Sequence, residues 1–468
     1  MLHLVPHLVT QRDARLWICA RAMDESQLES IALKVNGIDV PLPVKDWRAF
    51  PMQNPALDWT WARSMPMHYQ FVDKPALTPD RAYRASAGFN GGETAEASFV
   101  TLPEQLGDET KPLRVLLSSC YFNGNKRSRL AAALLSQLDR NGLRPHLRVW
   151  AGDQVYLDAP WYEFSIKTHS IAELESRHCA TYARTWFDER GLAGALSSGA
   201  NVFCTDDHDI WNNAPDPSAV AKDTRNRETR EAWFDLARQL GNAFQGDTGT
   251  ARRFSVSPLG FLVLDARVHR KEKREGLFSK AQWQQLREWA AEKQGLGVLI
   301  VGQPIFDPAT QGTGDMADYH LADYTADYAD LMNLLGQSSR STVVLTGDVH
   351  FSRVAWASFP AGGVSPRERR ITELISSPLS IVAGGRVLSL FNDWSAAPAK
   401  ASLPAQHSFS SVSMQTDDEL QSSAEGAMLL EFFRRGQRIF CSVTNWRLSD
   451  LDRARPFFRK EYFLGTSA

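Results

Sequence analysis

Titratable residues follow four apolar runs of this sequence, each at the point where the run ends. LRVLLSS ends at Cys120, LRVWAG precedes Asp153, NVFCT precedes Asp206-Asp207-His208-Asp209, and STVVLTG precedes Asp348. A single residue of this kind is usually a helix cap or a turn, because an unpaired buried carboxyl or thiol is costly. Four of them at corresponding places indicate a shared site. Ligands of α/β sheets bind at the carboxyl ends of the strands, so we expect these side chains along one edge of one sheet.

The chemistry of these residue types is that of a metal centre. Asp153 offers two oxygens and could bridge two cations, as in two-metal hydrolases. Cys120 could supply a thiolate, and Tyr156 a phenolate, because a nearby cation lowers the pKa of both groups. Asp207 and Asp348 are carboxylates suited to a harder divalent ion.

Two histidines accompany this predicted centre. His350 lies two residues after Asp348 and would point the same way from an extended backbone, so each could serve one of two adjacent metals. His208 could donate a proton to a leaving oxygen. A core histidine bonded to a backbone carbonyl is an equal alternative on the residues alone.

Three further residues are candidate substrate contacts. Asn212 and Asn213 could hydrogen-bond an oxyanion, but the Ala-Pro-Asp-Pro that follows makes turn formation equally reasonable. Arg267 could hold a phosphate through two hydrogen bonds. An ion pair with Asp265 is the simpler account.

The elements around these residues fall into two parts. Residues 1–104 hold short candidate strands separated by VNG, LTPD and NGG, which predicts a small β-sandwich domain. LPEQLGDETKP is the predicted linker. Strands and helices then alternate through residues 112–468 before a β-rich tail, which predicts a catalytic domain with a sheet core covered by helices.

Composition excludes several classes of protein. With 52 basic and 54 acidic residues in 468, the net charge of −2 gives no bulk attraction to nucleic acid or anionic membrane. No window approaches the roughly 18 apolar residues of a membrane span. Five dispersed cysteines form no disulfide pattern and no export signal is visible, so we expect a cytoplasmic protein. A trimmed periplasmic or secreted chain would look the same. The sequence carries no signal for an oligomeric state.

Five segments in chain order resemble the PhoD-like metallophosphatases, alkaline phosphatases of the calcineurin-like metallophosphoesterase superfamily: Cys120, GDQVY (152–156), DDHD (206–209), LDAR (264–267) and LTGDVH (345–350). GDxxY also resembles the motif of purple acid phosphatases. WICARA and LTPDRAYR resemble the fibronectin-like domain that precedes the catalytic domain in PhoD proteins. The resemblance implies an α/β fold, a four-layer α/β/β/α sandwich preceded by a small N-terminal β-sandwich.

The resemblance also implies roles for matching residues. An iron ion, as Fe(III), would be held by Cys120, Asp153, Tyr156 and His350. One or more divalent ions, calcium first and manganese, zinc or magnesium otherwise, would be held by Asp153, Asp207 and Asp348. His208 would be the catalytic histidine, and a metal-bound hydroxide would attack phosphorus. The implied activity is hydrolysis of small phosphate monoesters or diesters. Where the family usually has DDHE, this chain ends the motif with Asp209.

Two other classes of protein are alternatives. A non-catalytic protein of the same fold that binds a metal or a phosphate ligand would have lost ligands, whereas every expected position here holds a competent residue. A thiol enzyme using Cys120 as nucleophile needs a histidine base, and no Cys-His signature is present. Segments 160–190, 306–325 and 384–407 are candidates to cover the mouth of the site.

Overall fold

A computed structural model describes most of the chain. The described residues are 1–50, 67–89, 94–124, 128–307, 319–359, 369–380, 415–453 and 455–467.

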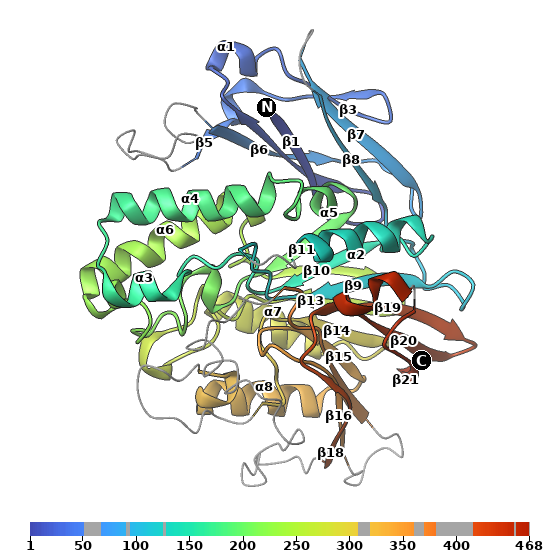
Figure 1. The fold of residues 1–468 in the computed structure, drawn as a ribbon. Coiled ribbons are helices and arrows are strands. Elements are labelled where there is room, and N and C mark those ends of the chain that lie inside the picture. The colour runs from blue at the N-terminus through green and yellow to red at the C-terminus, as the bar shows by residue number, and fades with distance from the viewer. Residues whose placement is uncertain are drawn as a thin grey trace.

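Two four-stranded sheets form the N-terminal part (Figure 1). The first has the order β1 (Leu2–Val9), β2 (Ala14–Arg21), β6 (Met67–Lys74) and β5 (Arg48–Ala49). The second has the order β4 (Ile38–Val40), β3 (Ala32–Val35), β7 (Ala82–Gly88) and β8 (Thr94–Val100). A single turn of helix, α1 (Glu25–Leu28), follows β2. Alternating buried residues along β3 and β8 are typical of sheets with one face in a core.

Two larger sheets follow. The six-stranded sheet has the order β11 (Ala200–Cys204), β10 (Leu147–Ala151), β9 (Leu113–Ser118), β19 (Gly426–Arg435), β20 (Arg438–Arg447) and β21 (Phe458–Thr466). The seven-stranded sheet has the order β12 (Arg252–Val256), β13 (Leu259–Val263), β14 (Leu296–Ile300), β15 (Thr342–Thr346), β17 (Arg369–Ile375), β16 (Ser352–Phe359) and β18 (Gln415–Ser422). Strands β9, β10 and β11 are mutually parallel, as are β13, β14, β15 and β17.

Helices cover the outer face of each large sheet (Figure 1). On the six-stranded sheet lie α2 (Ser128–Arg140), α3 (Trp161–Ile166), α4 (Ile171–Trp186), α5 (Ala193–Ser197) and α6 (Arg227–Gln245); on the other lie α7 (Lys280–Ala290) and α8 (Thr325–Gln337). Leu117 and Val298 belong to the core between the sheets, Trp150 to the core under the first helices, and Leu299 to that under α7 and α8. Neighbouring residues of a strand thus face opposite sides of their sheet, one toward the core between the sheets and one toward the core under the helices. The order of layers is therefore helices, sheet, sheet and helices. The predicted α/β/β/α sandwich with its N-terminal β-sandwich is confirmed.

Aromatic side chains join the N-terminal part to α4 and α6. The indole Nε1 of Trp17 donates to the carbonyl oxygen of Ala243 at 2.7 Å, and the ring centroids of Trp17 and Trp186 are 5.3 Å apart. The core of the small sheets is continuous with the core between the large sheets. Separate domains at 1–104 and 112–468 therefore stay a prediction.

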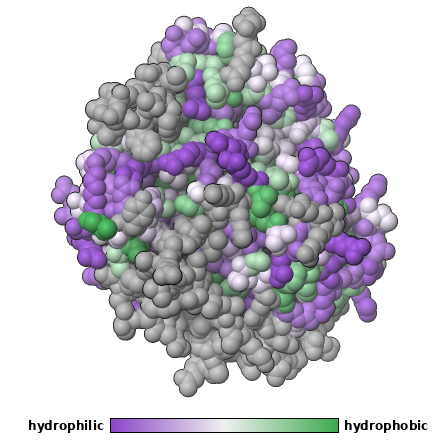
Figure 2. All heavy atoms as spheres, in the orientation of Figure 1, coloured by the Kyte–Doolittle hydropathy of each residue, from purple (hydrophilic) through white to green (hydrophobic). Residues whose placement is uncertain are grey.

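The described surface on the face in Figure 2 is mostly hydrophilic, with hydrophobic residues in small groups. Within the described ranges, no helix is both long and apolar enough to cross a lipid bilayer.

Candidate metal centre

The predicted ligands meet where the two large sheets meet. Cys120, Asp153 and Asp207 follow β9, β10 and β11 of one sheet, whereas Asp348 follows β15 of the other. The expectation that all four strands belong to one sheet is wrong, because β15 pairs with β14 and β17. The site is built from the carboxyl ends of strands in both sheets.

Three groups of side chains in this region could each hold a metal ion. They are Cys120, Asp153 and His350; Asp153, Asp207 and His208; and Asp206, Asp207 and Asp348, with the ligand atoms of each group within 4.8 Å of one another. Asp153 is shared by the first two groups and Asp207 by the last two. A chain of sites with shared carboxylates is the geometry that bridging ligands require.

Closer contacts define the first group. The Cys120 Sγ lies 3.5 Å from Asp153 Oδ2 and 3.1 Å from the carbonyl oxygen of Asp348. The Tyr156 hydroxyl lies 3.2 Å from His350 Nε2. Thiol, phenol, imidazole and carboxylate therefore converge on one point.

Burial sets the pKa values of this donor set. Desolvation, followed by the Cys120 and Asp207 charges, raises the pKa of Asp153 well above its usual range. Burial also raises the pKa of Cys120 to about 12 and that of Tyr156 above its ordinary value. Burial lowers the pKa of His350 to about 4, which keeps the imidazole neutral and able to ligate. A bound cation would reverse the shifts of the acids, because it stabilises their ionised forms.

Two carboxylate oxygens lie at the second and third groups without a hydrogen-bond donor. These are Asp206 Oδ2 and Asp207 Oδ1, both buried, and neither accepts a hydrogen bond from the described residues, although Arg267 Nη2 lies 3.9 Å from Asp207 Oδ1. Burial raises the pKa of Asp207, but the charges of His208 and Arg267 and the Asn213 amide together lower it below its usual value. Asp207 is therefore held as a carboxylate. An oxygen that accepts no hydrogen bond fits a metal ligand better than a structural hydrogen bond.

Strained backbone aims several of these side chains. Cys120 (φ 54°), Asp153 (φ 52°), Asp348 (φ 68°) and His350 (φ 52°) all have left-handed backbone. This conformation costs about 1–2 kcal/mol for each residue other than glycine. His350 does not sit on extended backbone as predicted, since its N–H turns back to the Asp348 carbonyl oxygen at 2.8 Å. Strain of this kind is typical of functional sites.

The glycines of the two GD motifs allow a close approach of chain segments. A Cβ at Gly152 (φ 89°) would lie 2.7 Å from the Cβ of Asp206. A Cβ at Gly347 would lie 2.2 Å from the Cβ of Ser119 and 2.4 Å from the Ala151 carbonyl oxygen. Gly347 therefore lets the two sheets touch at the centre.

His208 is oriented by a carboxylate. Its Nδ1 lies 2.9 and 3.0 Å from the two oxygens of Asp158, and its ring stacks on Tyr156 and Trp161 with centroids 4.5 and 5.6 Å away. Asp158 also accepts the Asn212 N–H at 2.8 Å. The imidazole is thus held by the Asp158 carboxylate. The alternative of a core histidine bonded to a backbone carbonyl does not describe this contact.

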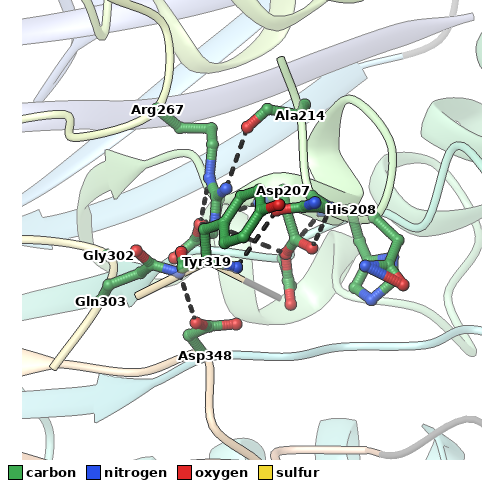
Figure 3. Close-up of polar contacts among 12 residues, drawn as sticks. Asp207, His208, Ala214, Arg267, Gly302, Gln303, Tyr319 and Asp348 are labelled. Carbon is green, nitrogen blue, oxygen red and sulfur yellow. Dashed lines mark hydrogen bonds and ion pairs between the residues drawn. The ribbon is translucent and has the colours of Figure 1, made fainter. Parts of the chain in front are cut away.

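The candidate substrate contacts lie close to the centre. Asn213 donates its N–H to Asp207 Oδ2 at 2.9 Å, and its buried Nδ2 has no partner among the described residues. Arg267 is 1% exposed, and its Nε donates to Asp206 Oδ1 at 2.6 Å. Its Nη1 donates to the Ala214 carbonyl oxygen (Figure 3). The side-chain ion pair is thus with Asp206 and not Asp265, which accepts the Arg267 backbone N–H instead. These contacts brace the aspartates, and a substrate contact by Arg267 stays a prediction.

Sequence reasoning missed Gln303, Asp158 and the role of Asp209. Gln303 Nε2 donates to Asp348 Oδ2 at 2.9 Å (Figure 3), and Arg270 donates to Gln303 Oε1. Gln303 follows the apolar run GVLIVG of β14, so the strand-end rule could have found it. Asp158 ends GDQVYLD but carries no separate signal.

Asp209 ties the two acidic loops together. Its carboxylate accepts the N–H groups of Asp153, Val155 and Asp206 at 2.9, 3.2 and 3.0 Å. The shorter acid at the end of DDHD therefore reaches its backbone partners.

One of the three predicted covering segments is largely visible. Segment 160–190 contains α3 and α4, which flank the site. Segment 384–407 and residues 308–318 of the segment 306–325 lie outside the described residues.

No protein-family model and no curated protein matches this chain. Among solved structures, PhoD aligns with a TM-score of 0.59 and 14% identity over 98% of this chain and 88% of its own. A purple acid phosphatase from yellow lupin (Lupinus luteus) seeds aligns with a TM-score of 0.57 and 10% identity over 99% of this chain and 74% of its own. The chain therefore has the metallophosphatase fold. The resemblance to PhoD and to purple acid phosphatases, drawn from five short motifs, is confirmed at the level of the fold.

Proposed function

We propose that this protein is a metal-dependent phosphoesterase that hydrolyses small phosphate mono- or diesters. The observation that carries the proposal is the chain of three buried ligand groups that share Asp153 and Asp207. The fold common to PhoD and purple acid phosphatase supports it.

The donor set favours two kinds of ion. Thiolate, phenolate and imidazole from Cys120, Tyr156 and His350, with Asp153, suit a transition metal such as Fe(III). The oxygen ligands of Asp207 and Asp348 suit calcium, with manganese, zinc or magnesium as other candidates. Bound cations would supply Lewis acidity, which activates water and neutralises charge on the phosphoryl oxygens.

The protein's own residues would orient the reaction. Water adds to phosphorus, the bond from phosphorus to the alcohol oxygen breaks, and that oxygen takes a proton. His208 would give this proton, and its contact with Asp158 through Nδ1, which would stabilise the imidazolium, supports this role. Asn213 would hydrogen-bond a phosphoryl oxygen, and its buried Nδ2, which makes no hydrogen bond to the described residues, supports this role.

Hydrolysis of p-nitrophenyl phosphate and bis(p-nitrophenyl) phosphate tests the proposal. Both are assayed as purified, after chelation, and after return of calcium, manganese, zinc or iron, with metal content measured by elemental analysis. We expect bound metal and turnover that chelation abolishes, and the preferred ester then separates monoesterase from diesterase. Bound metal without turnover of any phosphate ester would favour the non-catalytic binding protein.

A further inference from the structure

A cavity of about 480 Å³ lies beside the metal centre. It is bounded by α3 and α4 on one side and by residues that follow β9 on the other. Tyr156 lines this cavity and also contacts His350 in the centre. The cavity and the centre therefore share a wall.

Tyr156, the wall shared by the cavity and the centre, lies next to His208, the proposed proton donor to the leaving alcohol oxygen. The His208 ring stacks on the Tyr156 ring at 4.5 Å, and Phe122, which also lines the cavity, meets Tyr156 edge-on at 5.7 Å. His208 is the proposed proton donor to the leaving oxygen. The alcohol that departs must therefore lie near Tyr156, where the cavity begins.

Charged residues line the cavity, and most of them are already paired. The lining includes four arginines and two acids: Arg129, Arg177, Arg184, Arg190, Glu163 and Asp188. Arg177 binds both oxygens of Glu163, and Arg190 binds both oxygens of Asp188. These two pairs use up both acids of the lining, so the cavity keeps an excess of positive charge.

The paired acids leave over two arginines of the lining, Arg129 on α2 and Arg184 on α4, and Arg184 has the Arg177 charge beside it. The Nε of Arg184 donates to the carbonyl oxygen of Ala180 in its own helix at 3.3 Å, and no carboxylate of the described residues forms an ion pair with it. Burial lowers the pKa of Arg184, and the neighbouring Arg177 charge lowers it further. Arg184 is exposed to the cavity. A cation beside another cation is stabilised by an anion, and guanidinium suits phosphate in particular.

The position of Arg184 is held from both sides. The side-chain amide of Asn123 donates to the Arg184 carbonyl oxygen, which joins α4 to the opposite wall. On its other face, α4 packs Tyr182 flat on Phe244 at 4.5 Å and Trp186 against Trp17. The N-terminal β-sandwich therefore supports the helix that carries Arg184.

We propose that this cavity receives the alcohol portion of the substrate and that Arg184 binds a second phosphate group on that alcohol. The preferred substrates would then be alcohols that carry two phosphates, of which the centre removes one. This inference rests on the proposed phosphoesterase function and names its substrate class.

Matched pairs of substrates test the inference. Release of inorganic phosphate is measured from propanediol, butanediol and hexanediol bisphosphates and from the corresponding hydroxyalkyl monophosphates. With the wild-type protein, we expect at least one bisphosphate to exceed its monophosphate in kcat/KM by about ten- to a hundredfold, the effect of one charge-assisted contact. In Arg184→Gln this ratio should fall close to one, and Arg184→Lys should keep an intermediate ratio.

The control is Arg238→Gln, which removes an exposed arginine of α6 that pairs with Asp235. It should keep the wild-type ratio, and melting temperatures verify that all variants are folded. Equal rates for bisphosphates and monophosphates in the wild-type protein would overturn the inference and leave the phosphoesterase function standing. A preference that survives in Arg184→Gln would also overturn it. If the protein hydrolyses none of the bisphosphates, the monophosphates or the p-nitrophenyl esters, the proposed phosphoesterase function itself is overturned.

Discussion

Two buried acidic clusters in this protein differ in what balances their charge. Glu373 and Asp307 share the guanidinium of Arg353, at 2.8 and 3.0 Å, and Glu373 also accepts two backbone N–H groups. At the metal centre, Arg267 pairs with Asp206, but no described arginine, lysine or histidine forms an ion pair with Asp153. The first cluster carries its own cation and ties β16 and β17 to the loop after β14. The second includes Asp153 without such a cation among the described residues, and we propose that a metal ion takes that place.

Burial has opposite consequences in the two clusters. Burial lowers the pKa of Arg353, but the Glu373 and Asp307 charges outweigh this and raise it, so the arginine stays charged. At the centre the neighbours of Asp153 are acids and a thiol, which add to desolvation and raise its pKa. The first cluster is thus balanced by its own arginine, whereas ionised acids at the centre are unfavourable unless a metal ion binds, as we propose.

Loss of the bridging carboxylate should have the largest effect. Asp153→Asn keeps the side-chain volume but removes the charge shared by two ligand groups, so we expect a loss of kcat of roughly a thousandfold or more. Metal content should fall with it. Elemental analysis and turnover of p-nitrophenyl phosphate measure both, with Asp235→Asn on exposed α6 as the matched control. Full turnover in Asp153→Asn would rule out the bridging role.

Removal of the Arg353 guanidinium, the cation of the first cluster, should lower the stability of the fold and leave metal binding unchanged. Arg353→Met leaves Glu373 and Asp307 buried without their partner, which should cost about 3–5 kcal/mol of unfolding free energy. Urea denaturation measures this change. Metal content per folded molecule should match the wild type, and a selective loss of metal would mean that the two clusters are coupled.

Changing the acid behind His208 should lower turnover without removing metal. In Asp158→Asn the amide cannot stabilise the imidazolium, so we expect kcat to fall by about a hundredfold, at the low end of general acid contributions. The deficit should shrink for esters with good leaving groups, such as p-nitrophenyl phosphate, which need little protonation. An equal deficit for all esters, together with lost metal, would indicate a structural role instead.

A buried histidine with no acid behind it should give the smallest effect. Burial lowers the pKa of His178 to about 3, and neither ring nitrogen has a partner among the described residues. The unfolded chain takes up this proton near pH 6.5, so stability is lost as the pH falls from there toward 3. The loss is about 1.4 kcal/mol per pH unit.

Urea unfolding at pH 7 and pH 5 measures this slope. His178→Leu should make the stability less dependent on pH, whereas His269→Gln, at an exposed site, should not change the dependence. An unchanged slope in His178→Leu would show that His178 takes up its proton equally in the folded and the unfolded protein.

Much of the fold could be predicted from local sequence patterns. The helices at 171–186 and 280–290 begin with complete capping boxes at Ser170 and Ser279, which are local signals. The apolar runs that became β9, β10, β11 and β15 end where expected, and so the polar residues behind them were found. Each polar residue lies within a few positions of the apolar run that it follows. The sequence alone therefore determined which side chains could form the centre.

Tertiary structure decided how those side chains meet. Asp206 pairs with Arg267 across 61 positions, His208 with Asp158 across 50, and Gln303 with Asp348 across 45. The division of the strands between two sheets and the left-handed backbone of Cys120 and Asp153 likewise depend on contacts distant in sequence. Residue type sets what a carboxylate can bind. Only packing determines whether an arginine reaches it, and therefore whether it is a structural ion pair or a ligand for a metal.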